Sequence, residues 1–213
     1  MAISLQKGQG VSLQKQQHDL SRITIGLGWD IAPKKTGFLG GLLGGGSQAD
    51  YDLDVVAFLC DAQGQVRDLG RDASGQATLH NSDVIFFNNL KHRSGHIWLT
   101  GDNRTGAGDG DDEQIIVQLN DLPEQYASIR FVVQIYQGAR QGQSFGQVSN
   151  AYIRAVEQGG RELARYDLSG SQYQSARSLW FAELVRETGG WQFRAIGQPS
   201  DSDNFVDWLK QWV

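Results

Sequence analysis

The sequence predicts an all-β fold, an antiparallel β-sandwich with a short amphipathic helix at its C-terminal end. Three observations support this class. Apolar and polar residues alternate with a period of two in many short runs, Gly, Asn, Asp and Ser separate those runs at short intervals, and a helical period occurs only near the C-terminus. This pattern favours hairpins over alternating β-α units.

The strands are expected in chain order. Residues 21–27 alternate cleanly, residues 114–119 are short and β-branched, and residues 129–136 repeat the alternation with added aromatics. Further extended runs lie at 51–59, 83–87, 151–156, 163–168, 178–185 and 191–196. Gly189 and Gly190 stand between two apolar runs, which predicts a hairpin there.

The C-terminal helix is predicted at about residues 201–212. Its apolar side chains recur at i, i+3, i+4 and i+7, at Phe205, Trp208, Leu209 and Trp212. Ser202 and Asp203 are the expected N-terminal caps. An apolar stripe of this kind usually packs on its own core, so we expect the helix to cover the sandwich. The alternative is a helix that binds a partner protein.

Length and composition limit the possible functions. A β-rich chain of 213 residues fits a single domain over residues 1–213, and its formal net charge of -5 argues against nucleic acid as a ligand. Cys60 is the one cysteine, so no disulfide can form within the chain, and its apolar surroundings predict a buried thiol. The sequence shows no secretory signal and no membrane helix, which predicts a cytoplasmic protein.

Residues 101–113 form the most unusual segment. They contain five carboxylates and four glycines with a single arginine. Carboxylates held a few ångströms apart repel by roughly 1 to 4 kcal/mol per close pair, and a hard cation would relieve that repulsion. Calcium accepts six to eight oxygen ligands, and glycines allow a short backbone to curl around it. The segment therefore predicts a calcium site.

Known calcium motifs do not account for this segment. In an EF-hand register starting at Asp102, Glu113 fits position twelve, but Arg104 and Ala107 occupy positions three and six. A solvated acidic turn without an ion remains the alternative. Asp52 and Asp54 form a second acidic pair, and on a strand their side chains would share one face. If that strand end lies beside the segment 101–113, the two could enclose one or two ions.

Other segments offer weaker functional signals. Residues 33–46 are both glycine-rich and apolar, which is typical of a mobile loop or of a surface that docks on a partner. His92 and His96 lack the intervening Glu of a zinc-protease helix. Ser144 lies in a Gly-x-Ser-x-Gly sequence, but a strand is expected to follow it where a nucleophile elbow needs a helix. A non-enzymatic protein is therefore expected.

The acidic segment, GDNRTGAGDGDDE, closely resembles the signature of the TerD-domain family of tellurium-resistance and stress-response proteins. Other segments resemble the family in the same order: ISLQKG at 3–8, GLGWD at 26–30, DLD at 52–54, FFNNL at 86–90 and FGQVSNAYIR at 145–154. The resemblance covers roughly residues 1–197. Two departures are that the family commonly has Glu where Ala107 stands, and a small residue followed by Ser where Val55 and Val56 stand.

The resemblance implies a calcium-binding β-sandwich of bacteria, associated with metal, oxidative or phage stress. The candidate metal ligands carried over from it are Asp30, Asp52, Asp54, Asp102, Asn103, Asp109, Asp111, Asp112 and Glu113. The implied cofactor is calcium, which suits a dense oxygen cluster better than magnesium does. The expected partners are calcium ions and proteins, either products of the same stress operon or membrane-associated complexes.

Three functional classes follow. The leading one is a binding or sensing module in which calcium orders the acidic segment and presents an apolar surface, residues 38–43, to a partner. The second is a calcium-assisted hydrolase or ligand-processing enzyme. The third is a structural assembly subunit that associates through the C-terminal helix.

Overall fold

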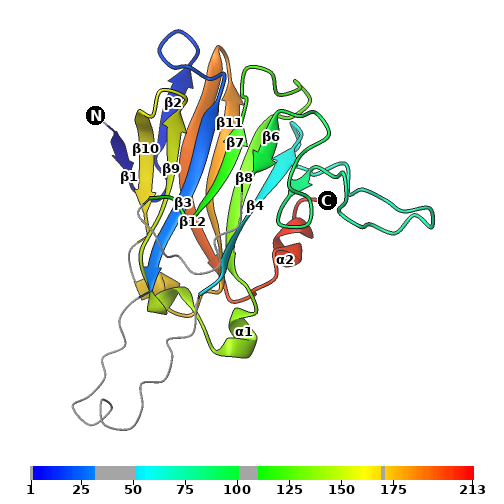
Figure 1. The fold of residues 1–213 in the computed structure, drawn as a ribbon, viewed down its shortest axis with the longest axis vertical. Coiled ribbons are helices and arrows are strands. Elements are labelled where there is room, and N and C mark those ends of the chain that lie inside the picture. Colours follow the sequence, from blue (N-terminus) through cyan, green and yellow to red (C-terminus); the bar gives the residue numbers. More distant parts are fainter. Residues whose placement is uncertain (1, 32–50, 101–109, 169–170) are drawn as a thin grey trace.

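The computed structural model describes residues 2–31, 51–100, 110–168 and 171–213. Two six-stranded sheets pack face to face as a β-sandwich (Figure 1). The first sheet has the order β1 (Ile3–Leu5), β10 (Glu162–Asp167), β9 (Val148–Glu157), β3 (Ile23–Ile31), β7 (Glu113–Val117), β6 (Ile97–Leu99). The second has the order β2 (Gly10–Gln14), β12 (Gly190–Ser200), β11 (Ser178–Glu187), β8 (Ser128–Ile135), β4 (Leu53–Cys60), β5 (Val84–Ile85).

The predicted fold class is confirmed. Every expected strand has its counterpart, and β11 and β12 form the hairpin expected at Gly189 and Gly190. Strand pairs are antiparallel apart from β1, which runs parallel to β10. The short strands β1, β2 and β6 were not predicted, because few of their residues alternate in burial and two of them are only three residues long.

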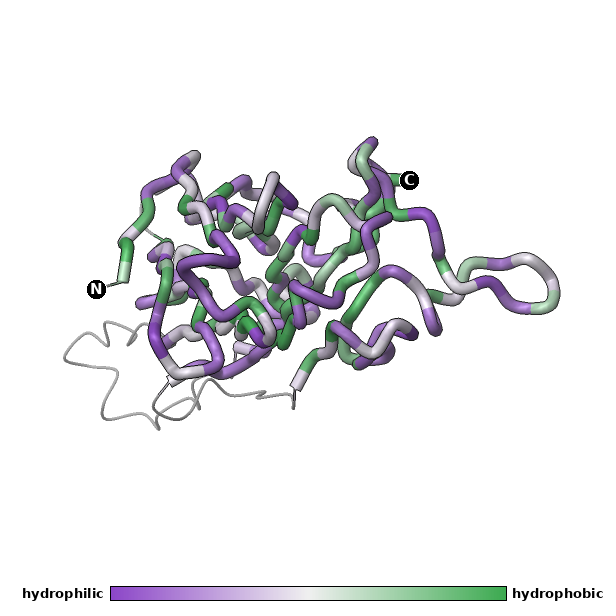
Figure 2. Tube along the Cα trace, turned by 90° about the horizontal axis from the view of Figure 1, so that it is seen from above, coloured by the Kyte–Doolittle hydropathy of each residue, from purple (hydrophilic) through white to green (hydrophobic). Residues whose placement is uncertain are grey.

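The main core lies between the two sheets. Ile23, Ile25 and Leu27 point into it from β3, whereas Phe131 and Val133 point into it from β8. Seen from above, hydrophobic stretches lie mainly inside the body and the turns are mostly hydrophilic (Figure 2). Side chains along a strand point alternately into this core and away from it, which explains why a period of two was readable in the sequence. Cys60 is fully buried as predicted, and burial raises the pKa of its thiol to about 11.

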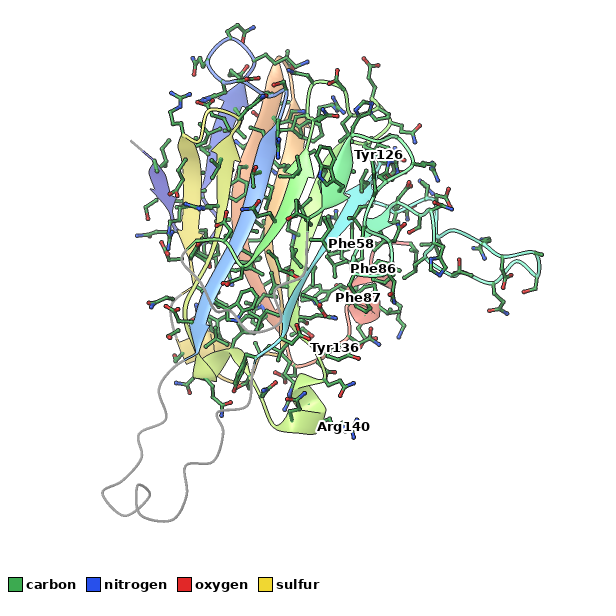
Figure 3. The ribbon with its side chains drawn as sticks, viewed as in Figure 1. Phe58, Phe86, Phe87, Tyr126, Tyr136 and Arg140 are labelled. Atoms are coloured by element: carbon green, nitrogen blue, oxygen red, sulfur yellow. The ribbon has the colours of Figure 1, made fainter. Side chains whose placement is uncertain are left out.

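The C-terminal helix packs on the outer face of the second sheet, as predicted. It is α2 (Val206–Leu209), so it is shorter than the expected 201–212. Trp212 lies just beyond it and meets Phe58 of β4 edge to face, with ring centroids 5.0 Å apart. Phe58 and Phe86 flank this helix (Figure 3). The expected caps act differently, since Ser202 Oγ donates to Asp207 and Asp203 accepts from the backbone N–H of Ala139.

Two further short helical segments connect the strands beyond β8. They are α1 (Gly138–Gln141) and the 3-10 turn η2 (Phe145–Gln147), and a second 3-10 turn, η3 (Ser171–Tyr173), precedes β11. Ser144 therefore leads through η2 into β9, which is not the strand-to-helix arrangement of a nucleophile elbow. The glycine-rich segment 33–46, including residues 38–43, lies outside the described residues, as do Asp102, Asn103 and Asp109.

Candidate metal site

Asp112 is held against β3 just before β7 begins. Its backbone N–H donates to Leu27 O at 2.8 Å, and its carboxylate Oδ2 accepts from the backbone N–H of Trp29 at 2.9 Å. Only 8% of the residue is exposed. The acidic segment thus enters the sheet with one carboxylate fixed beside the end of β3.

Asp30 lies near Asp112 at that end of β3. Its Oδ2 accepts a hydrogen bond of 2.7 Å from Asn150 Nδ2 of β9. Asp30, Asp112 and Asn150 all line one cavity of about 290 Å³, which Gly110 also lines. Gly110 is the first described residue after the segment 101–109, so the cavity lies beside the described end of the acidic segment, residues 110–113.

The acidic residues of this cavity favour a cation. Arg165 also lines the cavity, but its Nε lies 2.8 Å from Asp167 Oδ1, so its charge is paired with an acid that does not line the cavity. Burial raises the pKa of Asp112 above its ordinary value, and the hydrogen bond from Trp29 only partly opposes that rise. The negative charges of Asp30 and Asp111 raise the pKa of Asp112 further. A positive ion in the cavity would stabilise the ionised form of Asp112, so these residues fit a hard divalent cation with oxygen ligands.

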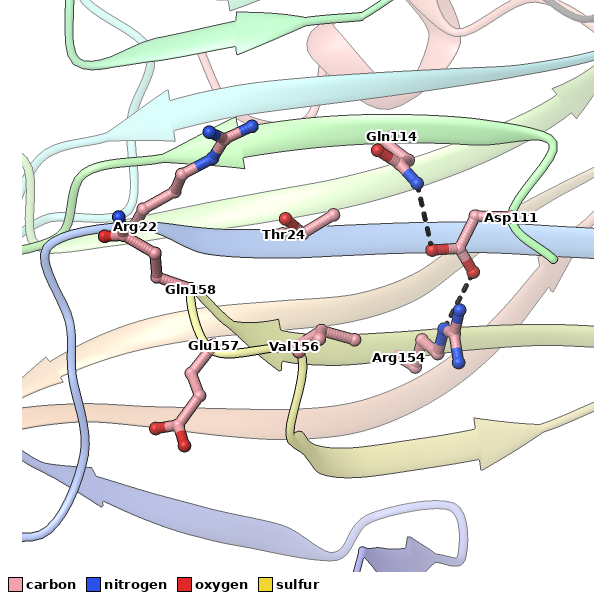
Figure 4. Close-up of a pocket in the computed structure, with 9 residues that line it drawn as sticks. Arg22, Thr24, Asp111, Gln114, Arg154, Val156, Glu157 and Gln158 are labelled. Carbon is pink, nitrogen blue, oxygen red and sulfur yellow. Dashed lines mark hydrogen bonds and ion pairs between the residues drawn. The ribbon is translucent and has the colours of Figure 1, made fainter.

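Asp111 faces a different side. It lies on the outer face of the first sheet, where its Oδ1 accepts from Arg154 Nε at 2.8 Å and from Tyr152 Oη at 3.1 Å. Gln114 Nε2 donates to its other oxygen at 3.3 Å, and Figure 4 shows these contacts with Arg154 and Gln114. The protein itself therefore supplies the positive charge beside Asp111.

The glycines of the GLGWD sequence make room for these contacts. A Cβ on Gly26 would overlap the Asp111 carboxylate, and a Cβ on Gly28 would overlap the ring of Tyr152. Both glycines lie on the outer face of β3, because Ile25, Leu27 and Trp29 face the core. The sequence thus leaves a flat strip on β3 across which Asp111 and Tyr152 lie.

Glu113 points between the two sheets. It shares a strand face with Ile115 of the core, and its Oε2 accepts from the backbone N–H of Val55 in β4 at 2.5 Å. β5 pairs with β4 only at Ala57 and Phe58. The Glu113 carboxylate therefore binds the edge of β4 beyond the reach of β5 and ties the sheets together.

Asp54 lies on the outer face of the second sheet, while Leu53 and Val55 belong to the core between the sheets. Its Oδ2 accepts from Gln134 Nε2 at 3.2 Å. Gln134 in turn accepts from the backbone N–H of Phe205 at 2.7 Å, so Asp54 is linked to the start of α2. Asp52 precedes β4, is half-buried, and its carbonyl accepts from the backbone N–H of Tyr136.

The predicted ligands are thus distributed over several places. The structure brings Asp30 and Asp112 to one cavity, whereas Asp111, Glu113 and Asp54 contact protein groups on other faces. Within the described ranges, no three His, Cys, Asp or Glu side chains form a group that could hold a metal ion.

Sequence reasoning missed three residues at this end of the sandwich. They are Asn150, Tyr152 and Arg154, all on β9. They lie within the FGQVSNAYIR stretch, but their role depends on β9 lying beside β3, which periodicity cannot show. Asn150 has a φ of 52°, in the left-handed region in which Asn is enriched, and its one trace in the sequence is an Asn inside an expected strand.

The histidine pair does not converge on a metal. The imidazole of His92 is buried and lies 3.2 Å from Asp83 Oδ1 through Nε2, while His96 Nδ1 lies 3.0 Å from Gln118 Oε1. Ser94 donates its backbone N–H to His92 Nδ1, which places the proton of the neutral ring on Nε2. Each imidazole thus binds a neighbouring protein group, His92 at Asp83 and His96 at Gln118.

The chain is similar to known proteins over nearly its whole length. The TerD domain matches residues 1–208. The chain is 60% identical to tellurium resistance protein TerX of Serratia marcescens, over 100% of both chains. It is 38% identical to stress response protein SCP2 of Bacillus subtilis (strain 168), again over 100% of both chains.

A solved structure shares the fold. The crystal structure of a homologue of telluride resistance protein (TerD) from Streptomyces coelicolor A3(2) matches with a TM-score of 0.61 and 24% identity, covering 92% of this chain and 99% of that chain. In the part of the chain that is described, no helix has the length and apolar character needed to cross a membrane.

Proposed function

This chain belongs to the TerD domain family of tellurium-resistance and stress-response proteins, and from that membership we propose that it is a calcium-binding module that acts by binding or sensing rather than by catalysis. The observation that carries the proposal is the position of Asp112. It is a buried carboxyl beside Asp30, its pKa is raised, and it lines the cavity at which the acidic segment joins the sheet.

Asp30 and Asp112 are the proposed ligands from the described residues, and Asn150, which lines the same cavity, holds Asp30 through its side-chain amide. Asp102, Asn103 and Asp109 would complete the shell from the acidic segment. When bound, calcium supplies a positive charge that offsets the mutual repulsion of these carboxylates. Calcium is preferred to magnesium because a dense set of protein oxygens suits an ion that accepts six to eight ligands.

Asp111 and Glu113 have a supporting part in this proposal. They flank Asp112 in the chain, and their bonds to Arg154 and to the Val55 backbone fix the start of β7 beside the cavity. Asp54 binds Gln134 on the outer face of the second sheet and does not line the cavity. Asp52 remains a candidate ligand at the start of β4. The strand ends beside the cavity would then already be held in place when residues 101–109 bind the ion.

The proposed biological role is a calcium-dependent interaction in the cytoplasm during stress. Calcium would order the acidic segment and so favour one surface for a protein partner, from the same stress operon or from a membrane-associated complex. A ligand shifts such an equilibrium only by its difference in affinity for the two states. The ion must therefore bind the state that recognises the partner more tightly than the state that does not.

Thermal unfolding with titrated calcium tests the proposal. Chelator-stripped protein should gain about 2.7 kcal/mol of stability at a hundredfold excess of calcium over the dissociation constant, and less with magnesium. Asp30→Asn should reduce the gain, whereas the control Asp121→Asn, at an exposed turn, should keep it. An unfolding temperature that does not respond to calcium would contradict the proposal.

A further inference from the structure

Tyr152 connects the first sheet to the described end of the acidic segment. It lies on β9, directly opposite Gly28 of β3. Its hydroxyl donates to Gly110 O at 2.8 Å and lies 3.1 Å from Asp111 Oδ1. Tyr152, Gly110 and Asp112 all line the cavity of about 290 Å³ at the proposed calcium site. One side chain of β9 therefore contacts the two residues that precede Asp112.

The ring of Tyr152 is held by two neighbours. It lies across Gly28, where any side chain would overlap it. The guanidinium carbon of Arg165 lies 3.7 Å from the ring centroid, well within the range of a cation–π contact. Arg165 is held in turn by its ion pair with Asp167. The sheet thus fixes the position from which the Tyr152 hydroxyl reaches the acidic segment.

The hydroxyl is a hydrogen-bond donor at neutral pH. Burial raises the pKa of Tyr152 to about 12, and the negative charge of Asp111 raises it as well. The Asp111 carboxylate has a second donor, since Arg154 Nε also binds its Oδ1. Among the described residues, by contrast, no group other than the Tyr152 hydroxyl forms a hydrogen bond with Gly110. The position of Gly110 therefore depends on Tyr152 more than that of Asp111 does.

Gly110 is a point at which the backbone needs such a contact. Its φ of 115° is one that glycine adopts freely and that other residues rarely adopt. Glycine also loses more conformational freedom than any other residue when it is fixed in one conformation. Two residues later, the backbone N–H of Asp112 donates to Leu27 O. Tyr152 thus fixes one end of residues 110–112, and β3 fixes the other.

On the basis of the proposed calcium site, we propose that Tyr152 is a positioning residue for that site, and that its hydroxyl sets the path of residues 110–112 along the cavity. Tyr152 acts on the ion through Gly110 and Asp112 and does not touch it. A backbone that is already held in its binding conformation loses less entropy when the ion binds, so the hydroxyl increases the affinity for calcium.

The test is Tyr152→Phe, which keeps the ring and its contact with Arg165 and removes the hydroxyl alone. Calorimetric titration of the full chain should give calcium binding about two- to tenfold weaker than in the unaltered protein, the range for one neutral hydrogen bond. Hydrogen exchange followed by NMR in chelator should be faster at the backbone N–H of Asp112, because that group binds Leu27 two residues beyond Gly110.

Tyr166→Phe is the matched control. Tyr166 lies on the neighbouring strand β10 but belongs to the core, where its hydroxyl lies 3.0 Å from that of Tyr173. This variant also loses a hydrogen-bonded hydroxyl and should unfold at a lower temperature, yet its calcium affinity should equal that of the unaltered protein. The control therefore separates a loss of stability from a loss of positioning.

Three results would overturn the inference while leaving the proposed function intact. They are calcium binding by Tyr152→Phe as tight as that of the unaltered protein, an equal loss of affinity in Tyr166→Phe, and unchanged hydrogen exchange at Asp112 in Tyr152→Phe. If the unaltered protein took up no calcium, the proposed function and this inference would both be wrong.

Discussion

Two buried aspartates, Asp83 and Asp112, have pKa values that the same fold shifts in opposite directions. Asp83 accepts hydrogen bonds at Oδ1 from Tyr126 Oη at 2.7 Å, from His92 Nε2 at 3.2 Å and from Arg93 Nη2 at 3.2 Å. Burial alone would raise the pKa of Asp83, but the hydrogen bonds from His92 and Tyr126 outweigh it, and the pKa lies below its ordinary value.

Asp112 shows the opposite balance. Burial and the charges of Asp30 and Asp111 keep its pKa above the ordinary value, despite the hydrogen bond from Trp29. The protein stabilises the charge of Asp83 with its own donors, whereas an added cation would stabilise the charge of Asp112. The difference teaches that a buried acid indicates a metal site only when the surrounding groups disfavour its charge.

Removing Asp83 should have the largest effect on stability. Asp83→Ala would leave His92, Tyr126 and Arg93 around a site that has lost their shared acceptor, and we expect a loss of about 3 kcal/mol. Urea unfolding would measure it. Asp121→Ala, at an exposed turn, is the control and should stay within about 0.5 kcal/mol of the unaltered protein. If Asp83→Ala lost no more stability than the control, the conclusion that His92, Tyr126 and Arg93 stabilise the Asp83 carboxylate would be wrong.

The two aspartates should respond to pH with opposite signs. Because the folded-state pKa of Asp83 is lowered, its contribution to stability is present above the unfolded value of about 4 and is lost as pH falls through the folded value. Because the pKa of Asp112 is raised, its contribution is present below about pH 4 and is lost as pH rises through the folded value.

Urea unfolding of metal-free protein across acidic pH would separate these contributions. Asp83→Asn should flatten the loss of stability on acidification, and Asp112→Asn should make the loss of stability steeper by removing an opposing effect. Identical pH profiles for the two variants would show that the two carboxyls do not differ as described.

Asp112→Asn should stabilise the metal-free protein at neutral pH by up to about 1 kcal/mol, because it removes a charge that its surroundings disfavour. The amide oxygen can still accept from Trp29. The same variant should lose most of the stabilisation by calcium. Thermal unfolding in chelator and in calcium measures both effects, and destabilisation in chelator with a normal calcium response would reverse the assignment.

Asp111→Asn should have the smallest effect. The ion pair with Arg154 is partly open to solvent, with 27% of the Arg154 side chain exposed, so its loss should cost less than about 1 kcal/mol. Most of the calcium response should remain, because Arg154 already supplies the charge beside Asp111. A calcium response as weak as that of Asp112→Asn would show that Asp111 leaves Arg154 to bind the ion.

Sequence patterns predicted the sandwich because inward and outward residues alternate in long strands such as β3 and β4. They did not predict β6, since three residues are too few to show a period. They also placed the terminal helix correctly on the sandwich but made it too long. Helix length depended on local polar contacts, such as that between Ser202 and Asp207, which compete with further helical turns.

The candidate site was predictable as a set of acids but not as a set of contacts. Asp30 and Asp112 were both identified from the sequence, and β3 does bring them to one cavity. The partners of the other acids come from distant parts of the chain, with Asp54 bound to Gln134 and Asp111 bound to Arg154. These pairings follow from strand order, which residue types and spacing alone do not determine.

Calorimetric titration of calcium into chelator-stripped full-length protein tests the central claim most directly, because it measures ion uptake without relying on a change in stability. The unaltered protein and Asp121→Asn should show saturable binding of calcium that is tighter than that of magnesium, and Asp112→Asn should show little or none. No saturable uptake by the unaltered protein, or equal uptake by Asp112→Asn, would contradict a calcium site built around Asp112.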